Sequence, residues 1–255
     1  MRFASLGSGS QGNALIVDAG DTKLLVDCGF STRAMIERLA RLSVRPEDIS
    51  AVLVTHEHSD HVSGVPRFAS RFKIPVYLTH GAFQVLYKDQ GVFFECRLVD
   101  SHAAFAVKGV EVSPFPVPHD AREPVQYTFS NGLHHLGLLT DSGSITPHII
   151  SVLKVCHALI LECNYAPDLL ETSSYPSVLK QRISGKLGHL ANEQAGSLLR
   201  AIGATRLQHI IAAHLSQQNN LPERAVRALA DALGCTENWI GVAHQEKGFA
   251  WRELF

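Results

Sequence analysis

The chain has 255 residues, 45% of them hydrophobic and 18% charged, a composition that allows one large globular domain or two small ones. Its formal net charge of −1 excludes the overall basic field that attracts nucleic acid over a whole surface. No apolar run approaches the roughly 20 residues that span a bilayer, and the first residues lack a secretion signal, so we expect a cytoplasmic protein without a membrane partner.

The first predicted elements are short strands around a glycine-rich segment. Residues 13–18 and 22–27 are β-rich and lie three residues apart, which predicts a hairpin. In the preceding segment SLGSGSQGN, Gly7, Gly9 and Gly12 match the G-x-G-x-x-G pattern of dinucleotide-binding enzymes. That pattern requires a helix directly after the glycines, whereas a strand follows here. We therefore interpret the glycines as a turn between two strands.

The rest of the chain alternates strands and helices. We expect a helix over 31–42, a buried strand over 51–55, and a second helix that follows the histidine-rich segment 56–61 and has inward positions from 62 to 72. Further strands are predicted at 74–78, 97–99, 103–107, 110–115, 125–130, 133–140, 157–161 and 206–213, further helices at 146–154, 176–183, 191–202 and 222–233, and a loop at 163–175. No linker or repeat divides the chain, which favours a single α/β domain over residues 1–255.

The strongest chemical signal is VLVTHEHSDHVSG, residues 52–64, in which H-x-H-x-D-H directly follows an apolar strand. Alternate side chains of an extended segment share a face, so His56 and His58 can chelate one ion. The chain then turns into a helix, which directs Asp60 and His61 toward a different point. The segment therefore predicts two neighbouring metal sites; a polar loop with incidental histidines is the weaker interpretation.

Three residues further along the chain follow predicted strands, where loops gather at one edge of a sheet. They are His119 in FPVPHDA, Asp141 in LGLLTDSG and His214 in HIIAAHLS. Each alone is more typical of a hydrogen-bonded turn, but together with H-x-H-x-D-H they form a specific set. Nitrogen and oxygen donors without thiolates suit zinc or manganese, and the residue types do not separate the two.

These motifs resemble the dinuclear site of the metallo-β-lactamase-fold hydrolases. Within that superfamily, SLGSGSQGN, VTHEHSDHVSG, TDSG, LECNY, GHLANEQA and AAHLSQQNN are similar to the WalJ/YycJ-like proteins, which are regarded as metal-dependent DNA exonucleases. The resemblance spans residues 5–220 and implies an α/β fold, a four-layer αββα sandwich with the metal site at one edge of its two sheets. It also places the glycine turn and the strand-end residue Asp27 near that edge.

The resemblance implies two divalent ions, each with three protein ligands of its own and one shared carboxylate. One ion would be held by His56, His58 and His119 and the other by Asp60, His61 and His214, with Asp141 bridging both. Two ions about 3.5–4 Å apart provide hydroxide near neutral pH and clamp both oxygens of an in-line displacement. We therefore expect a metal-dependent phosphodiesterase that acts on DNA, with Asp60 and Asp141 among its catalytic residues.

A phosphodiesterase also needs an acid that protonates the leaving oxygen. The segment GHLANEQAG contains His189 followed by Glu193, and it resembles a short His-containing motif of the tRNA 3′-processing enzymes in this superfamily. We predict that His189 is the general acid and that Glu193 orients it. The alternative is that His189 only caps the following helix.

Four further residues are candidates for substrate binding, namely Lys186, Asn164, Ser8 and Ser10. Lys186 belongs to a local basic cluster with Lys180 and Arg182, for which a solvated helix face is an equally good interpretation. Asn164 can instead turn the chain after its strand. With 7% aromatic residues, the sequence shows no stacking platform for single strands.

Two alternative functions would use the same site. One is a small-molecule hydrolase that acts on a cyclic phosphodiester, a lactone or a thioester, because the fold supports several substrates. The other is a metal-binding regulatory protein with little turnover. VPHDARE around the third histidine counts against glyoxalase II-like enzymes, and the bridging aspartate counts against class B β-lactamases. The sequence indicates no oligomeric state.

Overall fold

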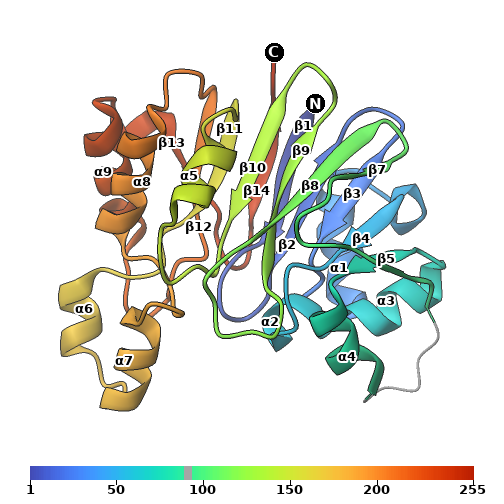
Figure 1. Cartoon of the computed structure of the whole chain (residues 1–255), viewed down its shortest axis with the longest axis horizontal. Coiled ribbons are helices and arrows are strands. Elements are labelled where there is room, and N and C mark those ends of the chain that lie inside the picture. The colour runs from blue at the N-terminus through green and yellow to red at the C-terminus, as the bar shows by residue number, and fades with distance from the viewer. Residues whose placement is uncertain (89–93) are drawn as a thin grey trace.

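The structure, a computed structural model, describes residues 1–88 and 94–255, with two mixed seven-stranded sheets packed face to face (Figure 1). The first sheet has the order β14-β1-β2-β3-β4-β5-β6. Its strands are β1 (Arg2–Gly7), β2 (Ala14–Asp18), β3 (Lys23–Val26), β4 (Ala51–Leu53), β5 (Val76–Leu78), β6 (Cys96–Leu98) and β14 (Phe249–Glu253). Pairing is antiparallel from β14 to β3 and parallel from β3 to β6.

The second sheet repeats this arrangement, with the order β13-β12-β11-β10-β9-β8-β7. Its strands are β7 (Phe105–Val107), β8 (Val110–Pro116), β9 (Val125–Ser130), β10 (His135–Leu139), β11 (Ala158–Glu162), β12 (His209–Ala213) and β13 (Ile240–Val242). Pairing is antiparallel from β7 to β10 and parallel from β10 to β13. The Asn131-Gly132 turn joins β9 to β10, as the sequence predicted, and Gly132 has a φ of 86°.

Helices cover the outer face of each sheet, which confirms the four-layer αββα expectation. The first sheet packs against α1 (Thr32–Arg41), α3 (Val65–Phe72) and α4 (His80–Lys88), and the second against α5 (Pro147–Leu153), α8 (Asn192–Ile202) and α9 (Pro222–Leu233). A third apolar cluster fills the space between the sheets. Within the described ranges, no helix is both long and apolar enough to cross a membrane.

Three short helices lie at the lower edge in Figure 1, namely α2 (Ser59–Val62), α6 (Pro167–Thr172) and α7 (Ser177–Ser184). The expected helix after the histidine segment is in fact two, α2 and α3. The predicted loop 163–175 contains α6, which buries only Leu170 and is too short to show a helical period. Helix α4 was not predicted; glycine at its second position lowers the helix propensity of a short segment.

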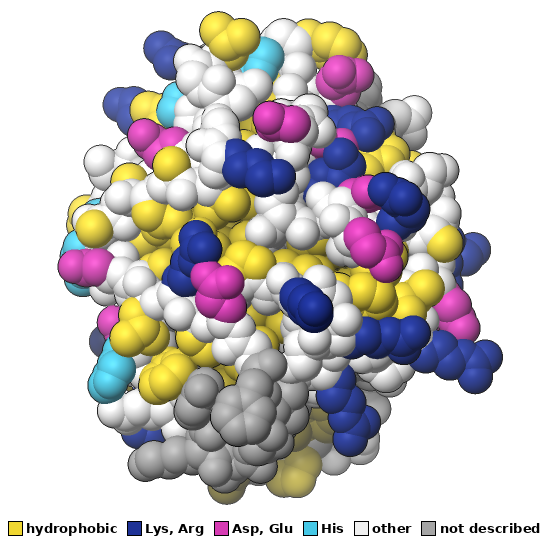
Figure 2. Space-filling model, turned by 90° about the vertical axis from the view of Figure 1, so that its right-hand side faces the viewer, with side chains coloured by type: hydrophobic (Ala, Val, Ile, Leu, Met, Phe, Trp, Pro, Cys, Tyr) yellow, Lys and Arg dark blue, Asp and Glu magenta, His cyan; other side chains and the backbone are white. Residues whose placement is uncertain are grey.

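Charged side chains are mixed on the side of the molecule that carries α3 and α4. Figure 2 shows Lys and Arg side chains interspersed there with acidic and hydrophobic ones. This mixture agrees with the net charge of −1 and with our expectation that no basic field extends over the whole surface.

Strand direction decides where the loops meet. Strands β3 and β4 run parallel in the first sheet, as do β10, β11 and β12 in the second. Strand β8 is antiparallel to β9, and β9 to β10, so β8 runs in the same direction as β10. The carboxyl ends of these strands therefore lie at one edge of each sheet, and the predicted metal ligands all follow such an end.

Candidate metal centre

The seven predicted metal ligands converge at the edge where the two sheets meet. They fall into overlapping groups in which one nitrogen or oxygen of each residue lies within 4.8 Å of those of the others. The groups are His56, His58 and His119; Asp60, His61 and His214; His56, His61 and Asp141; and Asp141 and His214 together with two residues outside the seven, Glu162 and His189. Four of the seven ligands come from residues 56–61 and three from the ends of separate strands.

Asp141 lies between the histidines of both sheets. Its Oδ2 is 3.3 Å from His61 Nε2, and its Oδ1 is 3.3 Å from His214 Nε2. Three atoms at this point, namely Asp141 Oδ2, His56 Nε2 and His214 Nε2, are buried and have no hydrogen-bond partner among the described residues. Three buried polar atoms without partners in one place would lower the stability of the fold unless a cation binds them. The donor set therefore fits the metal ions that the sequence predicted.

The first group combines two buried histidines with a more exposed one. His119 Nε2 lies 3.2 Å from His58 Nδ1, whose side chain is 29% exposed. Burial and the neighbouring His61 lower the pKa of His56 despite Asp141, and burial likewise lowers the pKa of His119. Both imidazoles are therefore held neutral, which is the form that binds a metal ion.

The second group contains one carboxylate, Asp60, and lies beside two others, Asp27 and Asp141. Asp60 Oδ2 lies 3.3 Å from His61 Nε2 and 3.5 Å from His214 Nε2. Although burial opposes it, the carboxylates of Asp141 and Asp60 raise the pKa of His214 to about 9. They and Asp27 also raise the pKa of His61 against the effect of burial. Positive charge is thus favoured at this point, and a bound cation would take the place of these protons.

Asp27, at the end of β3, orients two of the histidines. Its Oδ2 lies 2.7 Å from His61 Nδ1 and accepts a hydrogen bond from Thr55 Oγ1 at 2.9 Å. The same Thr55 hydroxyl is 3.0 Å from His56 Nδ1, so it can accept a hydrogen bond from that ring. Both rings are then protonated at Nδ1, which leaves each Nε2 unprotonated as a ligand atom; that of His61 lies 3.1 Å from Asn13 Nδ2. The family resemblance placed Asp27 near this edge, but nothing in the sequence suggested this contact.

His189 also reaches the site, but its partner is not the residue that we predicted. His189 Nδ1 lies 2.7 Å from Glu162 Oε1, whereas Glu193 is exposed on α8. His189 precedes that helix, whose N-cap is Ala191, so helical spacing does not apply and His189 is not the cap. Although burial opposes it, Glu162 raises the pKa of His189. The expectation that Glu193 orients His189 is therefore wrong.

Glu162, which the sequence did not single out, is fixed at the end of β11. Its side chain is fully buried, and its Oε2 accepts hydrogen bonds from the N–H groups of Ser142 at 3.0 Å and Leu190 at 3.2 Å. These contacts hold the carboxylate toward His189. The segment LECNY gives no sign of this role, because a glutamate at a strand end is ordinary in sequence.

The glycine-rich turn between β1 and β2 supports Asp60. Gly9 and Gly12 have φ values of 143° and 142°, which side chains disfavour. The turn brings Asn13 Nδ2 to 3.2 Å from Asp60 Oδ2. At Gly29, a Cβ would lie 1.8 Å from the Asp60 carbonyl oxygen, so only glycine allows this approach. The glycines therefore form a turn between β1 and β2, as predicted, beside the metal ligands.

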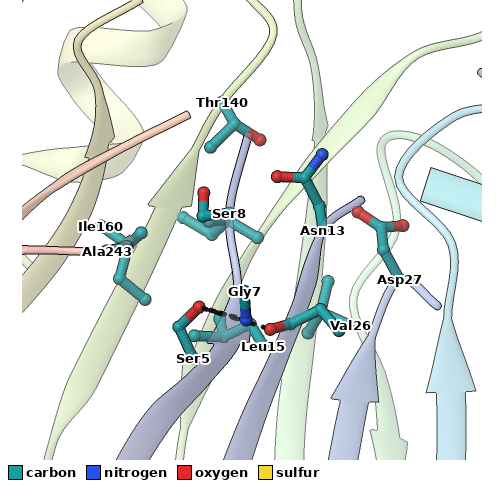
Figure 3. Close-up of a pocket in the computed structure, with 12 residues that line it drawn as sticks. Ser5, Gly7, Ser8, Asn13, Leu15, Val26, Asp27, Thr140, Ile160 and Ala243 are labelled. Atoms are coloured by element: carbon teal, nitrogen blue, oxygen red, sulfur yellow. Dashed lines mark hydrogen bonds between the residues drawn. The ribbon is translucent and has the colours of Figure 1, made fainter. Parts of the chain in front are cut away.

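A small cavity of about 30 Å³ lies between the sheets and is lined by residues of this turn and of the strands below it. Figure 3 shows Ser5, Ser8, Asn13, Asp27 and Thr140 around it, and the Ser5 hydroxyl accepts a hydrogen bond from the Gly7 N–H at 3.1 Å. Ser8 Oγ accepts one from the His214 N–H at 2.9 Å. Ser8 is buried, and its hydroxyl contacts the backbone of His214, one of the predicted metal ligands.

The open pocket at the metal centre has a volume of about 370 Å³. Ser10 and Asn164, two of the predicted substrate-binding residues, line it beside the ligands. Lys186 is exposed and lies outside this lining, while Arg182 from the same basic cluster is part of it. The site can thus hold metal ions, present a histidine paired with a carboxylate, and admit a substrate from solvent.

Comparison with known proteins gives matches along the whole chain. A family model described as the beta-lactamase superfamily domain matches residues 22–210. The exodeoxyribonuclease YycJ of Bacillus anthracis is 33% identical, over 100% of this chain and 93% of its own. The exodeoxyribonuclease WalJ of Streptococcus pneumoniae serotype 2 is 31% identical, over 94% and 91%. The crystal structure of the metallo-beta-lactamase fold protein YhfI from Bacillus subtilis has a TM-score of 0.76 at 16% identity and 99% coverage of both chains.

Proposed function

Because this chain belongs to the beta-lactamase superfamily, in the group of the YycJ and WalJ exodeoxyribonucleases, we propose that it is a dinuclear metal-dependent phosphodiesterase that degrades DNA from an end. The observation that carries this proposal is the convergence of seven nitrogen and oxygen ligands, three with unpartnered buried atoms, at one edge of the sheets, where four of the seven line an open pocket. Both sheets supply ligands, which supports a single hydrolase domain over residues 1–255.

Each of the two ions has its own protein ligands in this proposal, and one carboxylate is shared. His56, His58 and His119 would hold the first ion and Asp60, His61 and His214 the second, while Asp141, which groups with residues of both sets, would be the shared ligand. When bound, the ions supply Lewis acidity toward the phosphodiester and an activated water near neutral pH. The donor set suits zinc or manganese.

His189 supplies the proton for the leaving oxygen. Glu162 engages its Nδ1 at 2.7 Å, so the other ring nitrogen, Nε2, is the one from which His189 gives a proton to the substrate. The His189 side chain lines the open pocket and remains 20% exposed, so a substrate can reach it. Ser10 and Asn164 offer polar groups to the substrate in the same pocket.

The direct test is to incubate the purified chain with end-labelled single- and double-stranded DNA and Mn²⁺ or Zn²⁺. We expect successive shortening from one end. His189→Ala should lower the cleavage rate about 10²- to 10⁴-fold without loss of bound metal, the range for a general acid. Glu193→Ala, on the exposed side of α8, is the matched control and should keep activity.

Two results would contradict the proposal in different ways. Metal-loaded wild-type protein that cleaves no DNA would exclude the nuclease function. His189→Ala protein that binds metal and cleaves both DNA and bis(p-nitrophenyl) phosphate at the wild-type rate would exclude only the acid role of His189.

A further inference from the structure

One wall of the metal-site pocket contributes no metal ligand. It is formed by Tyr175, Leu179, Arg182 and Ile183, which all line the pocket, and we call these four residues the α7 wall. Tyr175 precedes α7 and the other three lie on that helix. The wall places an aromatic ring and two aliphatic side chains beside the histidines and carboxylates.

The spacing of these residues gives α7 one face toward the pocket. Leu179 and Ile183 lie four residues apart on α7 and so share a side of that helix. Tyr175 lines the same pocket from the segment that precedes the helix. Val178 lies off this face and is 77% exposed. Tyr175 and Ile183 also pack on a small buried cluster that includes Tyr165. The packing of Tyr175 and Ile183 on this cluster therefore supports the wall. No residue of α7 itself is fully buried.

An ion pair ties the wall to the metal ligands. Arg182 Nε lies 2.5 Å from Asp120 Oδ2, and Asp120 Oδ1 is 3.6 Å from His119 Nε2. The His189 N–H also donates a hydrogen bond to the Ile183 carbonyl at 2.8 Å. Because Asp120 balances the charge of Arg182, the wall offers the substrate an aromatic and aliphatic surface more than an unpaired cation.

We infer, on the basis of the proposed nuclease function, that the α7 wall binds the terminal nucleobase of the strand being cleaved, with Tyr175 stacked on it. The ligand side of the pocket takes the phosphodiester, so the attached base must lie against another side. Stacking on an aromatic ring suits every base, since each has a π face. A base paired inside a duplex has its faces covered by its neighbours, so this wall selects an unpaired end.

The test compares oligonucleotides with a natural terminal nucleotide and with an abasic tetrahydrofuran residue at that end, made in 5′ and 3′ versions. For the end that is degraded, Tyr175→Ala should lower kcat/KM on the natural substrate about 5- to 150-fold, the range for one stacked base. The abasic end should lower wild-type kcat/KM similarly, and the two changes together should cost little more than either alone. Tyr175→Phe should retain stacking, and Val178→Ala, on the same helix, should match wild type.

Several outcomes would overturn this inference. Equal kcat/KM of the wild type on natural and abasic ends would exclude base binding, even if Tyr175→Ala failed to fold. A loss in Tyr175→Ala that is equally large on both substrates would make the ring a structural support only. If wild-type protein cleaves none of these substrates, the nuclease function itself fails, and the inference with it.

Discussion

The two sheets supply the seven predicted metal ligands in different ways. The first sheet delivers four of them in the six residues from His56 to His61, directly after β4. The second delivers His119, Asp141 and His214 from the ends of β8, β10 and β12. In the first case local backbone geometry sets the relative positions of the ligands, whereas in the second strand register sets them. A change that disturbs the segment 56–61 should therefore weaken metal binding by all four of its ligands. A change at the end of β8, β10 or β12 should affect only the ligand that follows that strand.

Both sheets use strained backbone at the end of a strand. Asp27, Asp141 and His214 have φ values of 60°, 54° and 52°, in a region that residues other than glycine rarely occupy. Each directs a side chain into the site. Such conformations cost of order 1–3 kcal/mol each and persist where surrounding contacts fix them. At the shared edge of the sheets, the fold therefore tolerates backbone strain that lowers its stability, and this strain places the side chains of the site.

Asp141→Ala should have the largest effect, because this residue contacts ligands from both sheets. We expect both ions to be held more weakly and DNA cleavage to fall by about 10³-fold or more, roughly 4 kcal/mol in the barrier. Metal per chain by mass spectrometry and the rate of cleavage are the measurements. Asp231→Ala, on an exposed position of α9, is the control. Full metal content and full activity in Asp141→Ala would show that the two sheets do not share a ligand.

Removal of the metal ions by a chelator should lower the stability of the protein, and it should affect the site residues of the second sheet more than those of the first. At a concentration of 100 times its dissociation constant, one bound ion stabilises a fold by about 2.7 kcal/mol, so we expect Tm to drop by about 5–10 °C for each ion removed from a chain of this size. Hydrogen exchange should rise most around Asp141 and His214. It should rise less around His56 and His61, where Asp27 and Thr55 keep their contacts. Equal changes in both regions would contradict the difference between the sheets.

Asp27→Asn should weaken the first sheet's ligands as a group. The carboxylate contacts His61 directly and His56 through Thr55, and loss of such a contact lowers metal affinity about 10- to 100-fold. Competition with a metal indicator measures this affinity. Asp21→Asn, exposed in the β2–β3 turn, should match wild type. An unchanged affinity in Asp27→Asn would mean that residues 56–61 hold their geometry without this support.

Asn164→Ala is the counterpart in the second sheet and should have the smallest effect. Asn164 Nδ2 donates a hydrogen bond to the His214 carbonyl at 2.9 Å and so supports a single ligand. Loss of one hydrogen bond costs about 0.5–1.5 kcal/mol, which corresponds to a 2- to 10-fold loss of metal affinity. Gln217→Ala, exposed on the following loop, is the control. A loss as large as that of Asp27→Asn would remove the distinction between grouped and separate ligands.

The convergence of the predicted ligands could be inferred from the sequence to the extent that their spacing is local. H-x-H-x-D-H gives two directions for its side chains because an extended segment is followed by a helix, and the structure has this geometry in residues 54–62. The partner of His189 was not predictable. Glu193 is four residues away in sequence but points to solvent, whereas Glu162 is 27 residues away and lies at the end of a neighbouring strand.

The sequence by itself determined the types of the candidate ligands, the strand ends that carry them and the turn role of the glycines. These depend on residue chemistry and on short-range backbone preferences, which any segment of chain carries with it. Only the tertiary structure decided that Asp27 orients His61, that Glu162 engages His189, and that Tyr175 stands beside the metal ligands. Those contacts join residues of different strands and helices, and they exist only because strand order and register bring the carboxyl ends of both sheets to one edge.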